Sequence, residues 1–299
     1  DKIIIGFICF FGGNMLQKHL YRIRAMPYLI WTTLFTIVPL IFIIYYSFKV
    51  KDESFVFTLD NYKKFFTPTY VKIIFVSLKL SLLSTFLCLI LGFPAGLFLS
   101  RIKDEKRRNI FVLLFIMPLW TNFLLRTYSW MSIFREQGII NQILINIGII
   151  DSPIKFLNNN FAIIIGMIYN FLPFMVLPIY TALINIDKEY IECAKDLGAK
   201  GKDLFLRIIF PLSFKGVVSG CIMVFMPSVT TFIISDLLGG SQNMLVGNLI
   251  QREFLQARNW ETGSSISLIM IFIIFASLIL FKLFINKSES EFVEGFKIW

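Results

Sequence analysis

Long apolar stretches alternate with short polar ones along the whole chain. A helix needs about 20 apolar residues to cross roughly 30 Å of hydrocarbon, and six stretches are long enough. The pattern predicts an all-α membrane protein whose two ends lie on the same side of the membrane. The six expected spans cover about 26–48, 73–100, 109–134, 160–184, 212–234 and 264–284.

The same pattern divides the chain into three parts. Residues 1–25 precede the first span, and 1–14 hold an apolar run too short to cross, which is either an interfacial segment or an upstream extension. Residues 26–284 form the six-helix transmembrane domain, and 285–299 form a charged tail. No cleavable signal peptide is indicated, because the first span is too long and lacks a small-residue cleavage site.

Composition and charge agree with a membrane location. The chain is 57% hydrophobic and 16% charged, whereas soluble domains average about a quarter charged residues. The formal net charge is +10, and the loops on one side hold about half as many Lys and Arg residues as those on the other. The positive-inside rule then places both termini and the 187–211 loop in the cytoplasm. This one-sided excess indicates contact with membrane lipid and argues against a nucleic-acid partner.

The chain lacks the residues for its own catalysis. Its four cysteines form no CxxC pair and it has one histidine, so no metal site is expected. A phosphate-binding loop needs Gly-Lys followed by Ser or Thr, but the pair Gly201–Lys202 is followed by Asp203. We therefore expect no enzyme activity and no cofactor on this chain.

The 187–211 loop carries many charges and lies between two apolar spans. Asp187 and Glu189 favour a helix start, where negative charge is stabilised by the helix dipole. Gly198 stands where that helix would end. A second short helix over Lys202–Phe210 would then run into Pro211. The pattern predicts a helix, a glycine corner and a helix at the membrane surface.

Six residues of this loop follow a recognisable spacing: Glu192, Cys193, Ala194, Gly198, Ile208 and Pro211. This spacing resembles the EAA signature of permease subunits of binding-protein-dependent ABC importers. Cys193 and Phe210 depart from the Ala and Leu of the signature, but both are apolar. The resemblance implies the type I (MetI-like) importer fold, alternating access, and coupling of this loop to a partner subunit that binds ATP and Mg²⁺ and hydrolyses the ATP.

Two places could contact a solute. Asn122, Arg126 and Ser129 put a polar face on the third span, which lines either a solute path or an interhelical hydrogen-bond network. Asp236, at the outer end of the fifth span, suits a cationic solute or ends a helix next to glycines. Aromatic residues of the third span either face a cation or pack within the protein: Trp120, Tyr128 and Trp130.

Four further stretches are informative: 118–130, 138–141, 235–240 and 247–250. They resemble the B-type permease of spermidine/putrescine ABC importers. This resemblance implies a bacterial inner-membrane importer for polyamines. Its partners would be a homologous second permease, two ATP-binding subunits and an extracytoplasmic polyamine-binding protein.

Two alternatives remain open. The same architecture could carry another small solute, and Arg126 weakens the preference for a cation. An ion-driven secondary transporter would need acidic residues within the spans and inverted repeats, and the sequence shows neither clearly.

Overall fold

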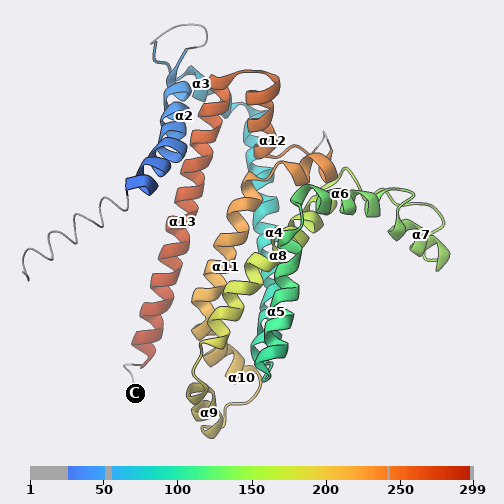
Figure 1. The fold of residues 1–299 in the computed structure, drawn as a ribbon, viewed down its shortest axis with the longest axis vertical. Helices are drawn as coiled ribbons and strands as arrows, with labels where there is room; N and C mark the ends of the chain where they lie inside the picture. The colour runs from blue at the N-terminus through green and yellow to red at the C-terminus, as the bar shows by residue number, and fades with distance from the viewer. Residues whose placement is uncertain (1–25, 51–55, 241–242, 297–299) are drawn as a thin grey trace, which may run out of the picture.

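The computed structural model describes residues 26–50, 56–240 and 243–296, and over these residues the regular structure is helical (Figure 1). An isolated bridge between Lys49 and Phe57 is the exception. The elements in chain order are η1 (Thr33–Ile37), α2 (Val38–Phe48), α3 (Asp60–Lys63), η2 (Lys64–Phe66), α4 (Pro68–Arg101), α5 (Glu105–Trp120), α6 (Phe123–Phe134), α7 (Ile139–Asn146), α8 (Asn160–Ile184), α9 (Lys188–Asp196), α10 (Lys202–Leu204), η3 (Phe205–Ile209), α11 (Phe210–Thr230), η4 (Ser235–Gly239), α12 (Val246–Gln251), η5 (Arg252–Gln256) and α13 (Trp260–Phe296).

Most of the predicted spans are confirmed. Within the described residues, five helices are long and apolar enough to cross a membrane, and a bent helix pair brings the number to six if the pair counts as one span. The five cover Met26–Phe48, Pro68–Arg101, Asn160–Ile184, Lys202–Thr230 and Trp260–Leu283. The predicted all-α membrane fold is therefore confirmed. The predictions on residues 1–25 lie outside the described residues.

The third span is not the continuous helix that the sequence predicted. Helix α5 ends at Trp120, and the chain bends by 90° before α6 begins. Thr121 and Asn122 have extended backbone, and the Asn122 side chain accepts hydrogen bonds from the amides of the next helix's first turn. The Thr121 hydroxyl donates to the Pro118 carbonyl (2.7 Å). These polar side chains satisfy the groups freed at the break, so a bend replaces the helix.

Helix α8 lies at the centre of the bundle, where it packs against both α4 and α11 (Figure 1). Glycines permit this close approach. A Cβ at Gly92 of α4 would lie 2.7 Å from Met175 Cγ, and a Cβ at Gly216 of α11 would lie 2.6 Å from the Pro178 carbonyl oxygen. Small residues serve this purpose in membrane helix pairs, because association there relies on close packing.

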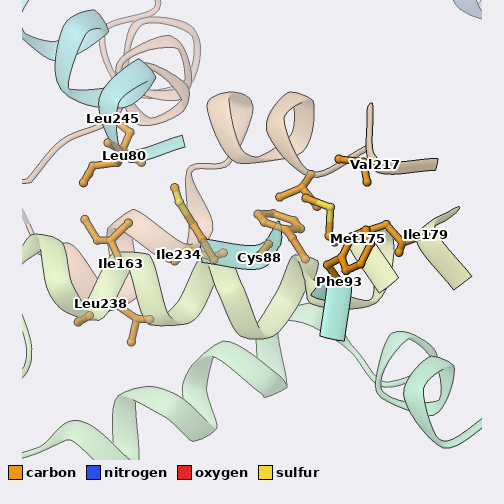
Figure 2. Packing of buried hydrophobic residues seen from close by; sticks show 14 of the residues in the cluster. Leu80, Cys88, Phe93, Ile163, Met175, Ile179, Val217, Ile234, Leu238 and Leu245 are labelled. Carbon is orange, nitrogen blue, oxygen red and sulfur yellow. The ribbon is translucent and has the colours of Figure 1, made fainter. Parts of the chain in front are cut away.

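The apolar core gathers side chains from several segments that are far apart in the sequence (Figure 2). It joins α4, α8 and α11 to the segment around η4. Labelled members are Leu80, Cys88 and Phe93 of α4, Ile163, Met175 and Ile179 of α8, Val217 of α11, Ile234 and Leu238 near η4, and Leu245 just before α12. Helices α2 and α13 pack together along one side of the bundle.

The fifth span also departs from the prediction. The expected separate helix at Lys202–Phe210 and the span that follows it form one continuous helix from Lys202 to Thr230. A π-helical turn at Phe205–Ile209 comes just before Pro211. A proline lacks the amide donor and crowds the carbonyl four residues earlier, and the wider turn accommodates it without ending the helix. The helix ends at Thr230, and α13 continues to Phe296, beyond the predicted end at 284.

Candidate functional site

The first half of the 187–211 loop has the predicted form. Helix α9 ends at Asp196, and Gly198 follows with φ of +86°. The Gly198 amide donates to the Lys195 carbonyl, and the Ala199 amide donates to the Ala194 carbonyl (both 2.9 Å). This bond pair is a Schellman motif, which ends a helix with glycine in the left-handed conformation. The glycine corner is therefore confirmed.

The described part of the chain covers only one side of α9. Ala194 is buried, whereas Glu192 and Cys193 are exposed. Leu197 is 89% exposed, and Tyr190 is 55% exposed. Tyr190, Cys193 and Leu197 follow at i, i+3 and i+7, so they share one side of the helix. The sequence reading missed this apolar strip, although its helical spacing was visible.

The second half of the loop is anchored to α4 through aromatic rings. The Phe93 ring centroid lies 5.4 Å from that of Phe205 and 5.7 Å from that of Phe210. Phe210 is one of the two departures from the EAA signature, and its ring fits into this cluster. Ile208 is half-buried, and Pro211 stands in the first turn of α11. The loop is therefore tied to α4 and continues directly into a span.

The three residues of the predicted polar face on the third span each make their own local contacts. Asn122 caps α6, and the Ser129 hydroxyl donates to the Leu125 carbonyl of its own helix (2.9 Å). The Arg126 guanidinium lies over the Phe123 ring, 5.8 Å from its centroid. Its Nε and Nη1 atoms are shielded from solvent and have no hydrogen-bond partner among the described residues. No interhelical hydrogen bond joins the three polar residues there.

The three candidate aromatic residues of the third span also have different surroundings. Trp130 packs against Phe134 and Tyr169, with ring centroids 5.1 and 5.4 Å apart. Trp120 at the end of α5 is exposed, and so is Tyr128 on α6. Trp130 thus has a packing role, whereas Trp120 and Tyr128 remain accessible.

Asp236 is exposed and held in place from a neighbouring helix. It lies in the π-helical turn η4, where its carboxylate accepts a hydrogen bond from Asn248 Nδ2 on α12. Asn248 Nδ2 also donates to the Phe232 carbonyl (2.9 Å). The η4 turn contacts α6, so the two predicted solute-contact regions are neighbours. No ion pair joins Arg126 to Asp236 in the described chain.

Two carboxylates near this end were missed by sequence reasoning. Glu253 and Glu261 are each 7% exposed. Glu253 accepts a hydrogen bond from the Tyr70 hydroxyl (3.3 Å), which belongs to a residue 183 positions earlier. No local pattern predicts that contact. With Asp236, they place several acidic groups at the end of the bundle that carries α12.

A helical membrane bundle with an EAA-type loop defines the class of importer permeases. Residues 89–289 match the family described as binding-protein-dependent transport system inner membrane component, and the chain belongs to this family. It is thus an inner-membrane permease subunit of an ABC importer.

Several relatives are similar over nearly their whole length. The chain is 38% identical over 268 residues to the spermidine/putrescine transport system permease protein PotB of Salmonella typhimurium (strain SL1344), covering 87% of this chain and 93% of the relative. PotB of Escherichia coli (strain K12) is 38% identical over 269 residues, covering 87% and 98%. The Escherichia coli inner membrane ABC transporter permease protein YdcU is 24% identical over 228 residues, covering 73% and 72%.

A solved structure has the same fold. It is a chain of a bacterial ABC transporter involved in the import of the acidic polysaccharide alginate. The TM-score is 0.74 at 16% sequence identity, with 93% of this chain and 98% of that chain covered. This likeness supports the architecture alone.

Proposed function

We propose that the solute of this importer is a polyamine, putrescine or spermidine. The observation that carries the proposal is the 38% identity to spermidine/putrescine permeases over 87% of the chain. Asp236 at the α12 end provides exposed negative charge that suits a polycation, whereas Glu253 is buried and lies 4.0 Å from Arg252. The exposed rings of Trp120 and Tyr128 add faces that attract cations.

The energy for transport comes from other subunits in this proposal. Two ATP-binding subunits hydrolyse ATP, a homologous second permease completes the path, and an extracytoplasmic binding protein delivers the solute. This chain binds no cofactor. The α9 end and both termini face the cytoplasm, as the distribution of Lys and Arg predicts. The uncovered strip of Tyr190, Cys193 and Leu197 is the surface that docks on an ATP-binding subunit.

The mechanism is alternating access driven from the α9 end. ATP binding closes the ATPase pair and moves α9, and the continuous helix from Lys202 to Thr230 carries this motion into the bundle. The aromatic contact of Phe210 with Phe93 extends the motion to α4. Solute and ATP shift the equilibrium only because each has different affinities for the two states.

An anionic solute is the alternative within the same architecture. It is favoured by Arg126, whose shielded Nε and Nη1 atoms have no hydrogen-bond partner in the described chain. Uptake measurements distinguish the two. Proteoliposomes holding the whole assembly should accumulate labelled putrescine or spermidine when ATP reaches the ATPase subunits, and unlabelled polyamine should compete. Accumulation of an anion such as glutamate, with no polyamine uptake, would show that the alternative is right.

Replacement of Asp236 tests whether its negative charge contributes to binding of the solute. Asp236→Asn keeps an oxygen that can accept from Asn248 but removes the charge, so the local structure should persist. We expect the polyamine concentration for half-maximal uptake to rise about tenfold, the effect of losing roughly 1.4 kcal/mol of binding.

Asp60→Asn is the matched control. Asp60 lies between the first two spans, 2.5 Å from Lys63, and the hydrogen bond from Lys63 lowers the pKa of its carboxyl. Its charge is already paired, so the uptake curve should not change. An unchanged curve for Asp236→Asn as well would remove Asp236 from the solute path.

A further inference from the structure

A basic cavity lies at the α9 end of the bundle. Its volume is about 770 Å³, and it is enclosed by the end of α4, the start of α5, the end of α8 and helix α9. Five cationic side chains line it, with Glu192 as the acidic member: Arg101, Lys103, Arg108, Lys188 and Lys195. A concave site lined mainly by one sign of charge concentrates ions of the opposite sign.

The cationic groups of this cavity outnumber its one acidic lining residue, Glu192. None of the five forms an ion pair there. The Arg108 Nε atom is shielded from solvent and has no hydrogen-bond partner among the described residues. Its neighbour Arg107 is paired with Asp104 at 3.4 Å and does not line the cavity. A shielded donor without a partner indicates a missing group, because buried polar atoms are nearly always hydrogen-bonded.

Apart from Ser100, the remaining lining is apolar. Leu97 of α4, Leu183 of α8 and Ile209 of η3 face the same space. These residues lie in the last turns of α4 and α8 and beside the start of α11, where the apolar spans meet the polar loops. A small hydrated anion gains nothing from contact with these apolar side chains. A phospholipid, in contrast, places a charged headgroup next to apolar acyl chains at this depth of the membrane.

We propose that this cavity binds the phosphate of an anionic phospholipid from the membrane leaflet at the α9 end. Arg101 and Arg108 would hold the phosphate oxygens, since guanidinium groups match phosphate geometry. Basic pockets between spans are suited to such headgroups. The lipid would join the α4–α5 connection to α9 and so hold α9 against the bundle. The inference is independent of which solute the importer carries.

Lipid binding can be measured directly on the full chain, purified with its associated subunits. Native mass spectrometry during titration with phosphatidylglycerol or phosphatidylcholine gives the affinity for each lipid. We expect selective retention of phosphatidylglycerol. The double variant Arg101→Gln/Arg108→Gln should weaken that binding about tenfold, because two charge-assisted contacts are lost.

Arg107→Gln is the control, because Arg107 neighbours Arg108 but lies outside the cavity. It should bind phosphatidylglycerol as the unmodified chain does. Equal binding of the two lipids, or unchanged affinity in the double variant, would overturn the proposal. Binding of inorganic phosphate alone, with the same dependence on Arg101 and Arg108 and without lipid selectivity, would overturn the assignment to a lipid.

Discussion

Leu197→Glu is expected to reduce the affinity for the ATP-binding subunit at least about 30-fold, which corresponds to about 2 kcal/mol at an interface hot spot. Leu197 is 89% exposed and contributes little to the folding of this chain, so the substitution should leave its structure intact. In the docked state the new carboxylate would lose its water without gaining a partner. Co-purification of the tagged permease with the ATP-binding subunit measures the effect.

The control is the same substitution at Leu255. Leu255 is 70% exposed and lies in η5, near the α12 end and far along the chain from α9. Leu255→Glu should leave recovery of the ATP-binding subunit unchanged. If both variants retained that subunit fully, the strip on α9 would not be the docking surface.

Gly216→Leu should destabilise the bundle by about 3 kcal/mol, as expected for severe overpacking. Even a single Cβ at this position would lie 2.6 Å from the Pro178 carbonyl oxygen, and a backbone atom cannot move aside as a flexible side chain can. Helices α8 and α11 would have to separate. The thermal unfolding midpoint of the purified protein, followed by the loss of monodisperse material after heating, measures the change.

Two further variants make this measurement decisive. Gly216→Ala should lower the midpoint in the same direction but by less, because only one methyl group is added. Ser219→Leu, on the exposed side of the same helix, should leave the midpoint close to that of the unmodified protein. Equal stability of all the variants would mean that α8 and α11 do not pack as closely as described.

Sequence reasoning predicted the elements whose causes are local. The run of apolar residues in 160–184 is sufficient to define α8, and Gly198 ends α9 through bonds within its own turn. The third span was predicted poorly, because membrane helices often tolerate a proline such as Pro118. The break there depends on Thr121 and Asn122 satisfying the backbone, which a hydropathy pattern does not show.

The candidate functional residues show the same difference between features with local causes and features that depend on tertiary contacts. The uncovered strip on α9 could be read from spacing once the helix was predicted. The enclosed carboxylate of Glu253 could not, since its partner Tyr70 lies 183 residues away. Trp130 resembled a cation-binding residue in the sequence, but tertiary contacts with Phe134 and Tyr169 give it a packing role.

The central claim is that α9 faces the cytoplasm and contacts a separate ATP-binding subunit. Labelling of Cys193 tests this claim most directly. Cys193 is exposed, and a variant with Cys9, Cys88 and Cys221 replaced would keep it as the remaining thiol. A membrane-impermeant maleimide should label it in inside-out vesicles stripped of the ATP-binding subunit. Adding that subunit back should protect it, and sealed right-side-out vesicles should stay unlabelled. Labelling from the outside, or no protection by the subunit, would contradict the account.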